Sequence, residues 1–164
     1  MSGIWNYIDS IDKQIFEYLI LNANPPFLTA ISETLGQPKL LVYPFLLWLG
    51  YALRKNPRKV PLQIVTAVLF LIAAEAAVSL LKSLIARPRP GMQMGIYVDP
   101  RAYSFPSAHT FNTSVLAVLI YFTYRSLFVY AALIAFITGL ARVMANYHFP
   151  GDVLGGWITG TIFA

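Results

Sequence analysis

Three groups of polar residues, separated by long apolar segments, have the types and spacing needed for chemistry on phosphate. They are Lys82-x6-Arg89-Pro90, Pro106-Ser107-Ala108-His109 and Arg142-x5-His148-x3-Asp152. The chain has two histidines, and both lie in these groups. Several cations, two imidazoles, one serine and one carboxylate form a set that can bind a phosphoryl group and transfer it.

The basic residues are suited to holding the phosphate. Lys82, Arg89 and Arg142 can surround the phosphoryl oxygens and offset the charge that spreads over them in the transition state. Ser107 and the amides at the start of the helix that follows Pro106 add neutral donors to the same anion. We therefore predict that these four side chains bind the substrate phosphate.

The two imidazoles are suited to bond making and proton transfer. One imidazole can attack phosphorus while the other protonates the leaving oxygen. If Asp152 accepts a hydrogen bond from one ring nitrogen of His148, the other nitrogen is left as the nucleophile. This reaction requires no metal and no other cofactor, and the residues offer no plausible ligand set for a two-metal site.

The composition places these residues in a membrane protein. Of the 164 residues, 57% are hydrophobic and 12% are charged, and the mean hydropathy is +0.61. A soluble domain has about 45–50% apolar and about 25% charged residues, so a soluble enzyme and a disordered chain are both excluded. The absence of cysteine excludes thiol catalysis and disulfides. We expect one integral membrane domain over residues 1–164, an all-α bundle of about five to six helices.

Six segments have helical patterns. The first, Ile4 to Leu21, is amphipathic, which predicts a helix that lies in the membrane interface or against the bundle. The others are apolar: Leu40 to Leu53, Val60 to Leu81, Phe111 to Tyr124, Leu127 to Met144 and Val153 to Ala164. The last is too short to cross a core of about 30 Å, so we expect it to cross only partly or the chain to be cut there.

Alternation of these segments brings the three polar groups to one side of the membrane. The loop from Arg54 to Lys59 and the turn at Arg125 then lie on the opposite side. The numbers of basic residues on the two sides are equal, but the first loop is a compact cluster of surplus positive charge, which favours a cytoplasmic position. We therefore expect the polar groups to face the periplasmic or extracellular side.

The three groups, in this order and with this internal spacing, resemble the signature of the type 2 phosphatidic acid phosphatase (PAP2) family. The resemblance is closest to its small bacterial lipid phosphatases. It implies that His148 is the nucleophile that becomes phosphorylated, Asp152 its orienting partner and His109 the general acid. The implied phosphate binders are Lys82, Arg89, Ser107 and Arg142. Two positions depart from the family pattern: Ala141 replaces a usual serine, and Ala108 replaces the commoner glycine.

The resemblance also implies a function. The expected activity is hydrolysis of a phosphate monoester or pyrophosphate on a lipid head group, in the plasma (inner) membrane of a bacterium. Lipid A 1-phosphate, phosphatidylglycerophosphate, undecaprenyl diphosphate and phosphatidic acid all remain candidate substrates. The partners are then the lipid substrate and the bilayer. We expect no nucleic acid, because the basic clusters lack interleaved aromatic residues, and no obligate protein partner is evident.

Two alternatives remain open. A phosphotransferase would use the same site and pass the phosphoryl group to another lipid instead of water. A small transporter is suggested by Glu75 within an apolar segment and by the ring of cations, but it explains neither histidine. We expect Glu75 to form a hydrogen bond to a neighbouring helix. Arg87 and Arg101 fit an interfacial anchor as well as a site residue.

The loop from Gly91 to Phe105 is expected to select the head group. Five large side chains in it could form an apolar wall beside the site, although a loop that simply covers the bundle would have the same composition. They are Met92, Met94, Tyr97, Tyr103 and Phe105.

Overall fold

The structure is a computed structural model, and it describes residues 2–23, 30, 32–34, 42–90 and 103–164. These residues contain no β-strand. The helices are α1 (Ser2–Ala23), α3 (Val42–Lys55), α4 (Val60–Ile85), α6 (Ala108–Thr123), α7 (Phe128–Met144) and α8 (Pro150–Phe163). Short 3₁₀ turns, Pro57–Lys59 and Arg125–Leu127, precede α4 and α7. The predicted all-α bundle with an N-terminal amphipathic helix is confirmed.

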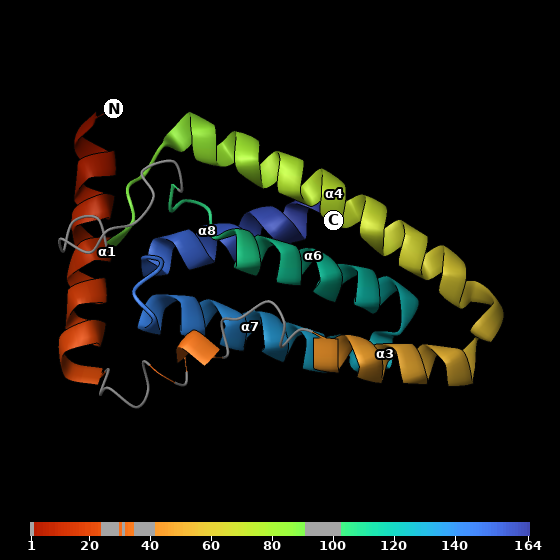
Figure 1. The fold of residues 1–164 in the computed structure, drawn as a ribbon. Helices are drawn as coiled ribbons and strands as arrows, with labels where there is room; N and C mark the ends of the chain where they lie inside the picture. The colour runs from red at the N-terminus through yellow and green to blue at the C-terminus, as the bar shows by residue number, and fades with distance from the viewer. Residues whose placement is uncertain (1, 24–29, 31, 35–41, 91–102) are drawn as a thin grey trace.

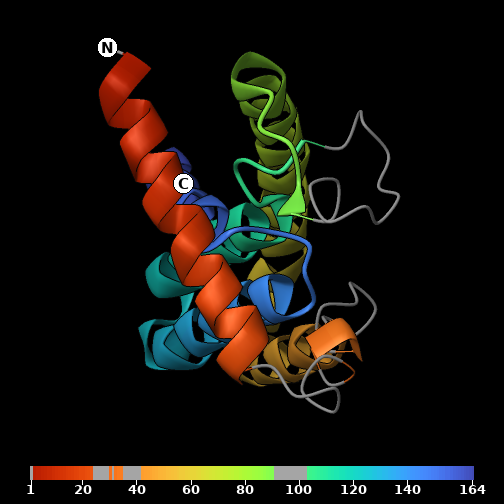
Figure 2. The same cartoon turned by 90° about the vertical axis from the view of Figure 1, so that its left-hand side faces the viewer.

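The helices α4, α6, α7 and α8 run alongside one another, and α1 stands across one end of this group (Figure 1). The view from that end shows α1 passing in front of α6, α7 and α8, with α4 beside it (Figure 2). The core forms around α6, where Phe111 and Val115 are fully buried against Ala74 and Val78 of α4. Because α6 lies at the centre of the bundle, its first turn lies close to the ends of the helices packed around it.

Two glycines allow α8 to lie directly against α6. A Cβ atom on Gly156 would lie 2.8 Å from the carbonyl oxygen of Ser107, and one on Gly160 would lie 2.5 Å from that of Phe111. Both distances are too short for any side chain. Glycines four residues apart let two membrane helices approach closely. This contact holds the first turn of α8, which carries Asp152, beside the N-terminus of α6.

Within the part of the chain that the structure describes, two helical stretches are long and apolar enough to cross a membrane, Pro57–Ile85 and Arg125–Met144. Their mean hydropathies are 2.4 and 2.0, yet only 11% and 28% of the respective apolar windows are buried inside the protein. A core helix of a soluble protein would be covered on most sides. These helices instead expose large apolar side chains along their length, which is the surface that a lipid environment requires.

The N-terminal helix α1 uses two different faces. Its apolar stripe, which includes Ile4, Ile8 and Ile15, is exposed. The face toward the bundle carries buried Asp12 and Phe16. Packed in this way, α1 rests against the bundle and at the same time presents an apolar stripe outward. The sequence left open whether this helix lies in the membrane interface or against the bundle, and the structure is compatible with both at once.

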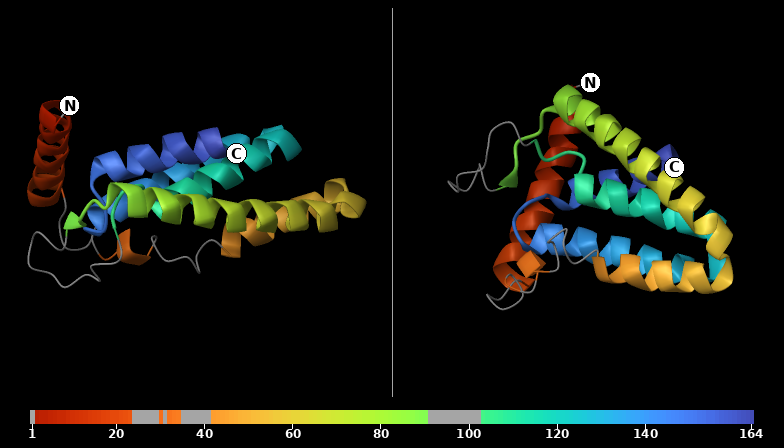
Figure 3. Two further views of the ribbon diagram at one scale, coloured as in Figure 1. Left: turned by 90° about the horizontal axis from the view of Figure 1, so that it is seen from above. Right: turned by 45° about the vertical axis from the view of Figure 1, so that its right-hand side comes forward.

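The connections gather at the two ends of the bundle as alternation predicts. The turn that contains Asn56 and the turn at Arg125 lie at one end, while the chain after α4 and the turn between α7 and α8 lie at the end crossed by α1 (Figure 3). The α4 helix stops at Ala86, which adopts the left-handed conformation (φ 50°). The turn before α8 uses Asn146 in the same region (φ 61°), where asparagine is tolerated better than most residues.

Candidate active site

The three sequence groups meet at the end of the bundle that α1 crosses (Figure 2). Lys82 lies in the last turn of α4, His109 in the first turn of α6 and Arg142 in the last turn of α7. Arg89 follows α4, and His148 precedes α8. Helix ends and the residues beside them thus bring together positions that are up to 70 apart in the sequence, as predicted.

Three half-buried cations form one side of the site. Lys82, Arg89 and Arg142 lie close enough to act on one another electrostatically. The Lys82 ammonium donates a hydrogen bond to the carbonyl oxygen of Tyr103, and the Arg142 guanidinium lies 4.4 Å from the ring centroid of Tyr147. Like charges gathered in a partly dry place repel one another, so this arrangement favours an anion between them.

His148 and Asp152 form a buried pair. The exposed fraction is 1% for His148 and 0% for Asp152. The His148 Nδ1 atom lies 3.5 Å from Asp152 Oδ2, which is longer than a normal hydrogen bond, and Oδ2 accepts a hydrogen bond of 2.9 Å from the Phe149 amide. In apo structures such catalytic contacts are often long and shorten when substrate binds.

Burial also sets the charge of the candidate nucleophile. Burial lowers the pKa of His148 to about 4, although the neighbouring Asp152 carboxylate acts in the opposite direction. The imidazole is therefore neutral at pH 7. Because Nδ1 faces Asp152, the lone pair that remains for attack on phosphorus is on Nε2. Asp152 also stabilises the start of α8 through its bond with the Phe149 amide, so its capping and orienting roles coexist.

The first turn of α6 contributes His109 and Ser107 in different ways. His109 is half-buried and lies within electrostatic range of Lys82, Arg89 and Arg142. Ser107 is fully buried, and its amide donates to the carbonyl oxygen of Asp152 at 3.0 Å. Its hydroxyl accepts a hydrogen bond of 2.9 Å from Thr110. The Ser107 amide is therefore occupied, and only the hydroxyl proton stays a candidate donor for the predicted phosphate contact.

Arg87 is a site residue that sequence reasoning did not assign. Its Nη1 atom lies 2.7 Å from Asp152 Oδ1 and 2.8 Å from Asp12 Oδ2, and its Nη2 atom lies 2.7 Å from Asp9 Oδ1. It therefore joins α1 to the His148–Asp152 pair and is not an interfacial anchor. Asp9 and Asp12 were missed as well, because in the sequence they resemble the solvated side of an amphipathic helix.

The remaining predicted residues fall into three classes. Glu75 accepts a hydrogen bond of 3.2 Å from Asn112 of α6, as expected. The Phe105 ring packs against Gly155, where a Cβ atom would lie 2.3 Å from it. Arg101, Met92, Met94 and Tyr97 lie outside the described residues, so the predicted role of their loop in head-group selection stays a prediction.

Comparison with known proteins assigns the family. The sequence profile described as PAP2 superfamily matches residues 63–164. The chain belongs to this family. The matched region includes α6, α7 and α8 and contains the three polar groups.

Two curated PAP2 relatives are phosphatases of bacterial lipids by name. Phosphatidylglycerophosphatase B of Bacillus subtilis is 34% identical over 93 residues, which cover 50% of this chain and 45% of the relative. The match thus spans less than half the length of that protein. Lipid A 4'-phosphatase of Bacteroides thetaiotaomicron is 30% identical over 168 residues, which cover 94% of this chain and 74% of the relative. By these names, the activity class of the PAP2 relatives is phosphoric monoester hydrolase.

Two solved structures share the PAP2 fold seen here. The first is the transmembrane PAP2-type phosphatidylglycerolphosphate phosphatase from Bacillus subtilis, with a TM-score of 0.74 and 23% identity over 96% of this chain and 83% of that chain. The second is LpxE from Aquifex aeolicus, with a TM-score of 0.65 and 24% identity over 92% of this chain and 90% of that chain. The fold is therefore that of a bacterial membrane protein.

Proposed function

We propose that this protein is a membrane lipid phosphatase that removes phosphate from a lipid head group through a phosphohistidine intermediate. The observation that carries the proposal is a buried, neutral His148 paired with Asp152 beside three half-buried cations. These groups supply a nucleophile, its orienting partner and an anion site in one place. The phosphatase names of two relatives support the same activity.

In the first half-reaction, the phosphate sits between Lys82, Arg89 and Arg142. His148 Nε2 attacks phosphorus, the N–P bond forms and the bond from phosphorus to the lipid oxygen breaks. Burial and the cations Arg142, Arg89 and Lys82 lower the pKa of His109 to about 4 before phosphate binds. The bound phosphate offsets these cations, so a monoprotonated phosphate can pass its proton to His109. His109 then gives this proton to the leaving oxygen, and the lipid departs as a neutral alcohol. Asp152 stabilises the positive charge that develops on the imidazole through Nδ1.

In the second half-reaction, water replaces the lipid alcohol. His109, now neutral, takes one proton from the water as its oxygen bonds to phosphorus and the N–P bond breaks. Inorganic phosphate leaves and His148 regains its neutral form. His109 carries out the proton transfers to the lipid oxygen and from water, His148 carries the phosphoryl group, and side-chain cations offset the charge on phosphorus. No step in this scheme therefore requires a metal ion.

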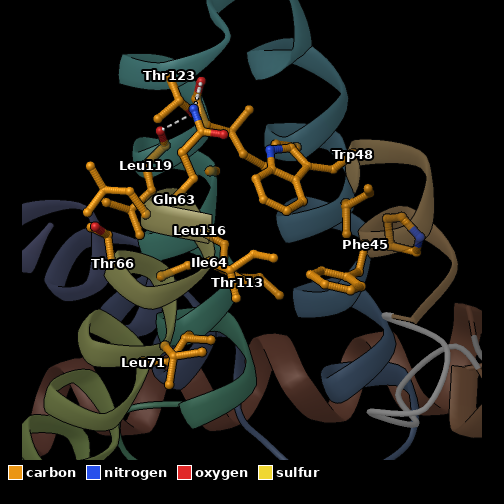
Figure 4. A pocket seen from close by; sticks show the side chains of 18 residues that line it. Phe45, Trp48, Gln63, Ile64, Thr66, Leu71, Thr113, Leu116, Leu119 and Thr123 are labelled. Carbon is orange, nitrogen blue, oxygen red and sulfur yellow. Dashed lines mark hydrogen bonds between the residues drawn. The ribbon is translucent and has the colours of Figure 1, made fainter. Parts of the chain in front are cut away.

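The bundle also offers space for the apolar part of a lipid. A cavity of about 470 Å³ lies between α3, α4, α6 and α7, and Phe45, Trp48, Leu71 and Leu116 line it (Figure 4). Thr113 of α6 also lines it, and the Thr113 hydroxyl donates to the carbonyl oxygen of His109. An acyl chain that hangs from a phosphate at the site would reach this cavity within one helical turn.

The direct test is phosphate release by the detergent-solubilised protein from short-chain forms of the four candidate lipids. We expect release from at least one of them, and we expect activity to persist in excess EDTA. A short-chain substrate is required because chelation alters the aggregation of long-chain lipids. Activity that EDTA abolishes and a divalent ion restores would refute the metal-free scheme. Transfer of the phosphoryl group to an added lipid alcohol without release would identify a phosphotransferase.

The orientation can be tested with single cysteines, because the chain contains none. Ser10 is exposed on α1 at the site end, and Asn56 is exposed at the opposite end. We expect Ser10→Cys to react with a membrane-impermeant thiol reagent added to intact cells, and Asn56→Cys to react only after lysis. The opposite labelling pattern would place the site on the cytoplasmic side and contradict the orientation inferred from the Arg54–Lys59 cluster.

A further inference from the structure

The Arg87 guanidinium is engaged by carboxylates from two parts of the chain. Asp152 belongs to the first turn of α8, and Asp9 and Asp12 belong to α1. All three nitrogen–oxygen distances are 2.7–2.8 Å, which is the range of charge-assisted hydrogen bonds. Three carboxylates more than neutralise one guanidinium, so Arg87 is poorly suited to bind a further anion such as phosphate.

The surrounding structure fixes the position of Arg87. The preceding Ala86 adopts the left-handed conformation with φ 50°, which costs about 1–2 kcal/mol for a non-glycine residue. The Ser104 amide and hydroxyl both donate to the Arg87 carbonyl oxygen, at 2.8 and 3.2 Å. The guanidinium carbon lies 4.3 Å from the ring centroid of Phe149. Backbone strain that neighbouring contacts maintain is characteristic of functional sites.

Arg87 and His148 approach different oxygens of the same carboxylate. Asp152 Oδ1 faces Arg87 at 2.7 Å, whereas Oδ2 accepts from the Phe149 amide and faces His148 Nδ1. With Oδ1 bound, the carboxylate cannot turn its planar group away from the imidazole. Without Arg87, Oδ1 loses its charged partner in a fully buried place, and the orientation of Oδ2 toward His148 is no longer fixed.

The helix α1 holds Arg87 in turn. Asp12 is bound through both oxygens, because Oδ2 contacts Arg87 and Oδ1 accepts a hydrogen bond of 2.7 Å from the Gly151 amide. A Cβ atom on Gly151 would lie 2.6 Å from Asp12 Oδ2, so glycine is required for this approach. Asp9 contacts Lys13 as well as Arg87. Burial alone would raise the pKa of Asp9, but these two cations lower it below its usual value.

We propose that Arg87 is a positioning residue that orients Asp152 toward the nucleophile His148, and that Asp9 and Asp12 make α1 a working part of the active site. This inference rests on the proposed phosphatase function. It makes the N-terminal amphipathic helix more than a membrane-interface element. Its acidic face, with Asp12 buried and Asp9 partly exposed, supports, through Arg87, the residue that orients the attacking imidazole.

The kinetic consequence separates Arg87 from the phosphate binders. Arg87→Gln removes the support of Asp152 but leaves Lys82, Arg89 and Arg142 in place. We therefore expect kcat to fall about 10–100-fold, the size seen when an orienting partner of a functional group is lost. KM and the inhibition constant for vanadate should change less than about threefold, because ground-state binding of the anion is not affected. Arg89→Gln should instead weaken vanadate binding.

The experiment measures kcat, KM and vanadate inhibition with a soluble short-chain substrate for the wild type and six variants, of which Arg87→Gln and Arg89→Gln are the first two. Arg125→Gln is the matched control, since Arg125 is an exposed arginine that stacks on Tyr121 at the opposite end of the bundle. Arg87→Lys tests conservative rescue: one ammonium cannot hold three carboxylates in the same geometry, so kcat should be intermediate between wild type and Arg87→Gln. Asp12→Asn and the double variant Arg87→Gln/Asp12→Asn complete a cycle. We expect the double variant to lose no more activity than Arg87→Gln alone.

Three results would overturn the inference. In the first, kcat of Arg87→Gln and Arg87→Lys equals that of Arg125→Gln. In the second, Arg87→Gln raises KM and weakens vanadate inhibition as Arg89→Gln does, which would make Arg87 a phosphate ligand. In the third, the losses of Arg87→Gln and Asp12→Asn simply multiply in the double variant. If Arg87→Gln does not fold, Arg87→Lys is used in its place: a lower kcat with an unchanged KM supports the inference, and a raised KM contradicts it. A wild type that releases no phosphate would refute the proposed function instead.

Discussion

Replacing His148 with alanine is expected to lower kcat by about 10⁴-fold or more on every substrate, with no phosphoenzyme detectable. The variant lacks the nitrogen that bonds to phosphorus, and no better leaving group can replace a missing nucleophile. The measurement is rapid acid-free quenching with radiolabelled substrate, followed by detection of a base-stable phosphoryl group on the protein. The wild type should trap it and His148→Ala should not.

The comparison requires that the His148 variant keeps its fold. His148 is 1% exposed, so alanine leaves a space beside Phe149, and such truncations cost about 2–5 kcal/mol in a core. Asp152→Asn provides a second variant that preserves shape while it removes the carboxylate charge. We expect it to retain the nucleophile and to form phosphoenzyme slowly. A phosphoenzyme on His148→Ala at the wild-type rate would place the nucleophile elsewhere and refute the scheme.

The residues that contact substrate in this scheme could be predicted because their chemistry is distinctive. Only 12% of the residues are charged, and both histidines of the chain lie in the polar groups. A purely structural role does not explain why both histidines occur there. Helix alternation then sufficed to bring Lys82, His109 and Asp152 together, because segments of about membrane length can only go back and forth. In the described residues, the end of α4, the start of α6, the end of α7 and the start of α8 lie at the same end of the bundle (Figure 3).

The support of the site could not be predicted, because it depends on packing. Arg87 and Arg101 are both arginines in one polar connection, and nothing local distinguishes them. The partners of Arg87 lie 65 positions ahead, at Asp152, and 78 positions behind, at Asp9. That pairing exists only because α1 stands across the bundle end (Figure 2) and turns Asp9 and Asp12 toward Arg87. Hydropathy does not specify which face of an interfacial helix turns inward.

The role of Ser107 illustrates the same limit. The sequence identified a helix N-terminus with a serine, which is a common anion site. The structure shows that the Ser107 amide instead bonds to the Asp152 carbonyl oxygen, at 3.0 Å. This bond exists because Gly156 and Gly160 let α8 approach α6. A close helix contact thus turns one expected phosphate donor into a link between two segments of the candidate site.

His109→Ala is expected to fail in a different way from His148→Ala, and the leaving group reveals the difference. The variant keeps the attacking nitrogen but lacks the proton donor for the departing lipid oxygen. General acid catalysis contributes about 10²–10⁴-fold, so activity on a lipid phosphate should fall by that amount. With p-nitrophenyl phosphate, the leaving p-nitrophenolate is stable without protonation. In the first half-reaction, His109→Ala should therefore lose much less rate on p-nitrophenyl phosphate than on a lipid phosphate, because this leaving group does not need the acid.

The second half-reaction sharpens this test, because His109 also serves there as the base that activates water. In His109→Ala, release of p-nitrophenol should be fast for one equivalent and then slow, as phosphoenzyme accumulates on His148. A stopped-flow burst equal to the enzyme concentration is the expected signal, and the wild type under the same conditions should show a smaller burst. His109 lies in the first turn of α6, so the variant's helix content is checked by circular dichroism. If His148→Ala is the variant that the better leaving group rescues, the roles of the two histidines are reversed.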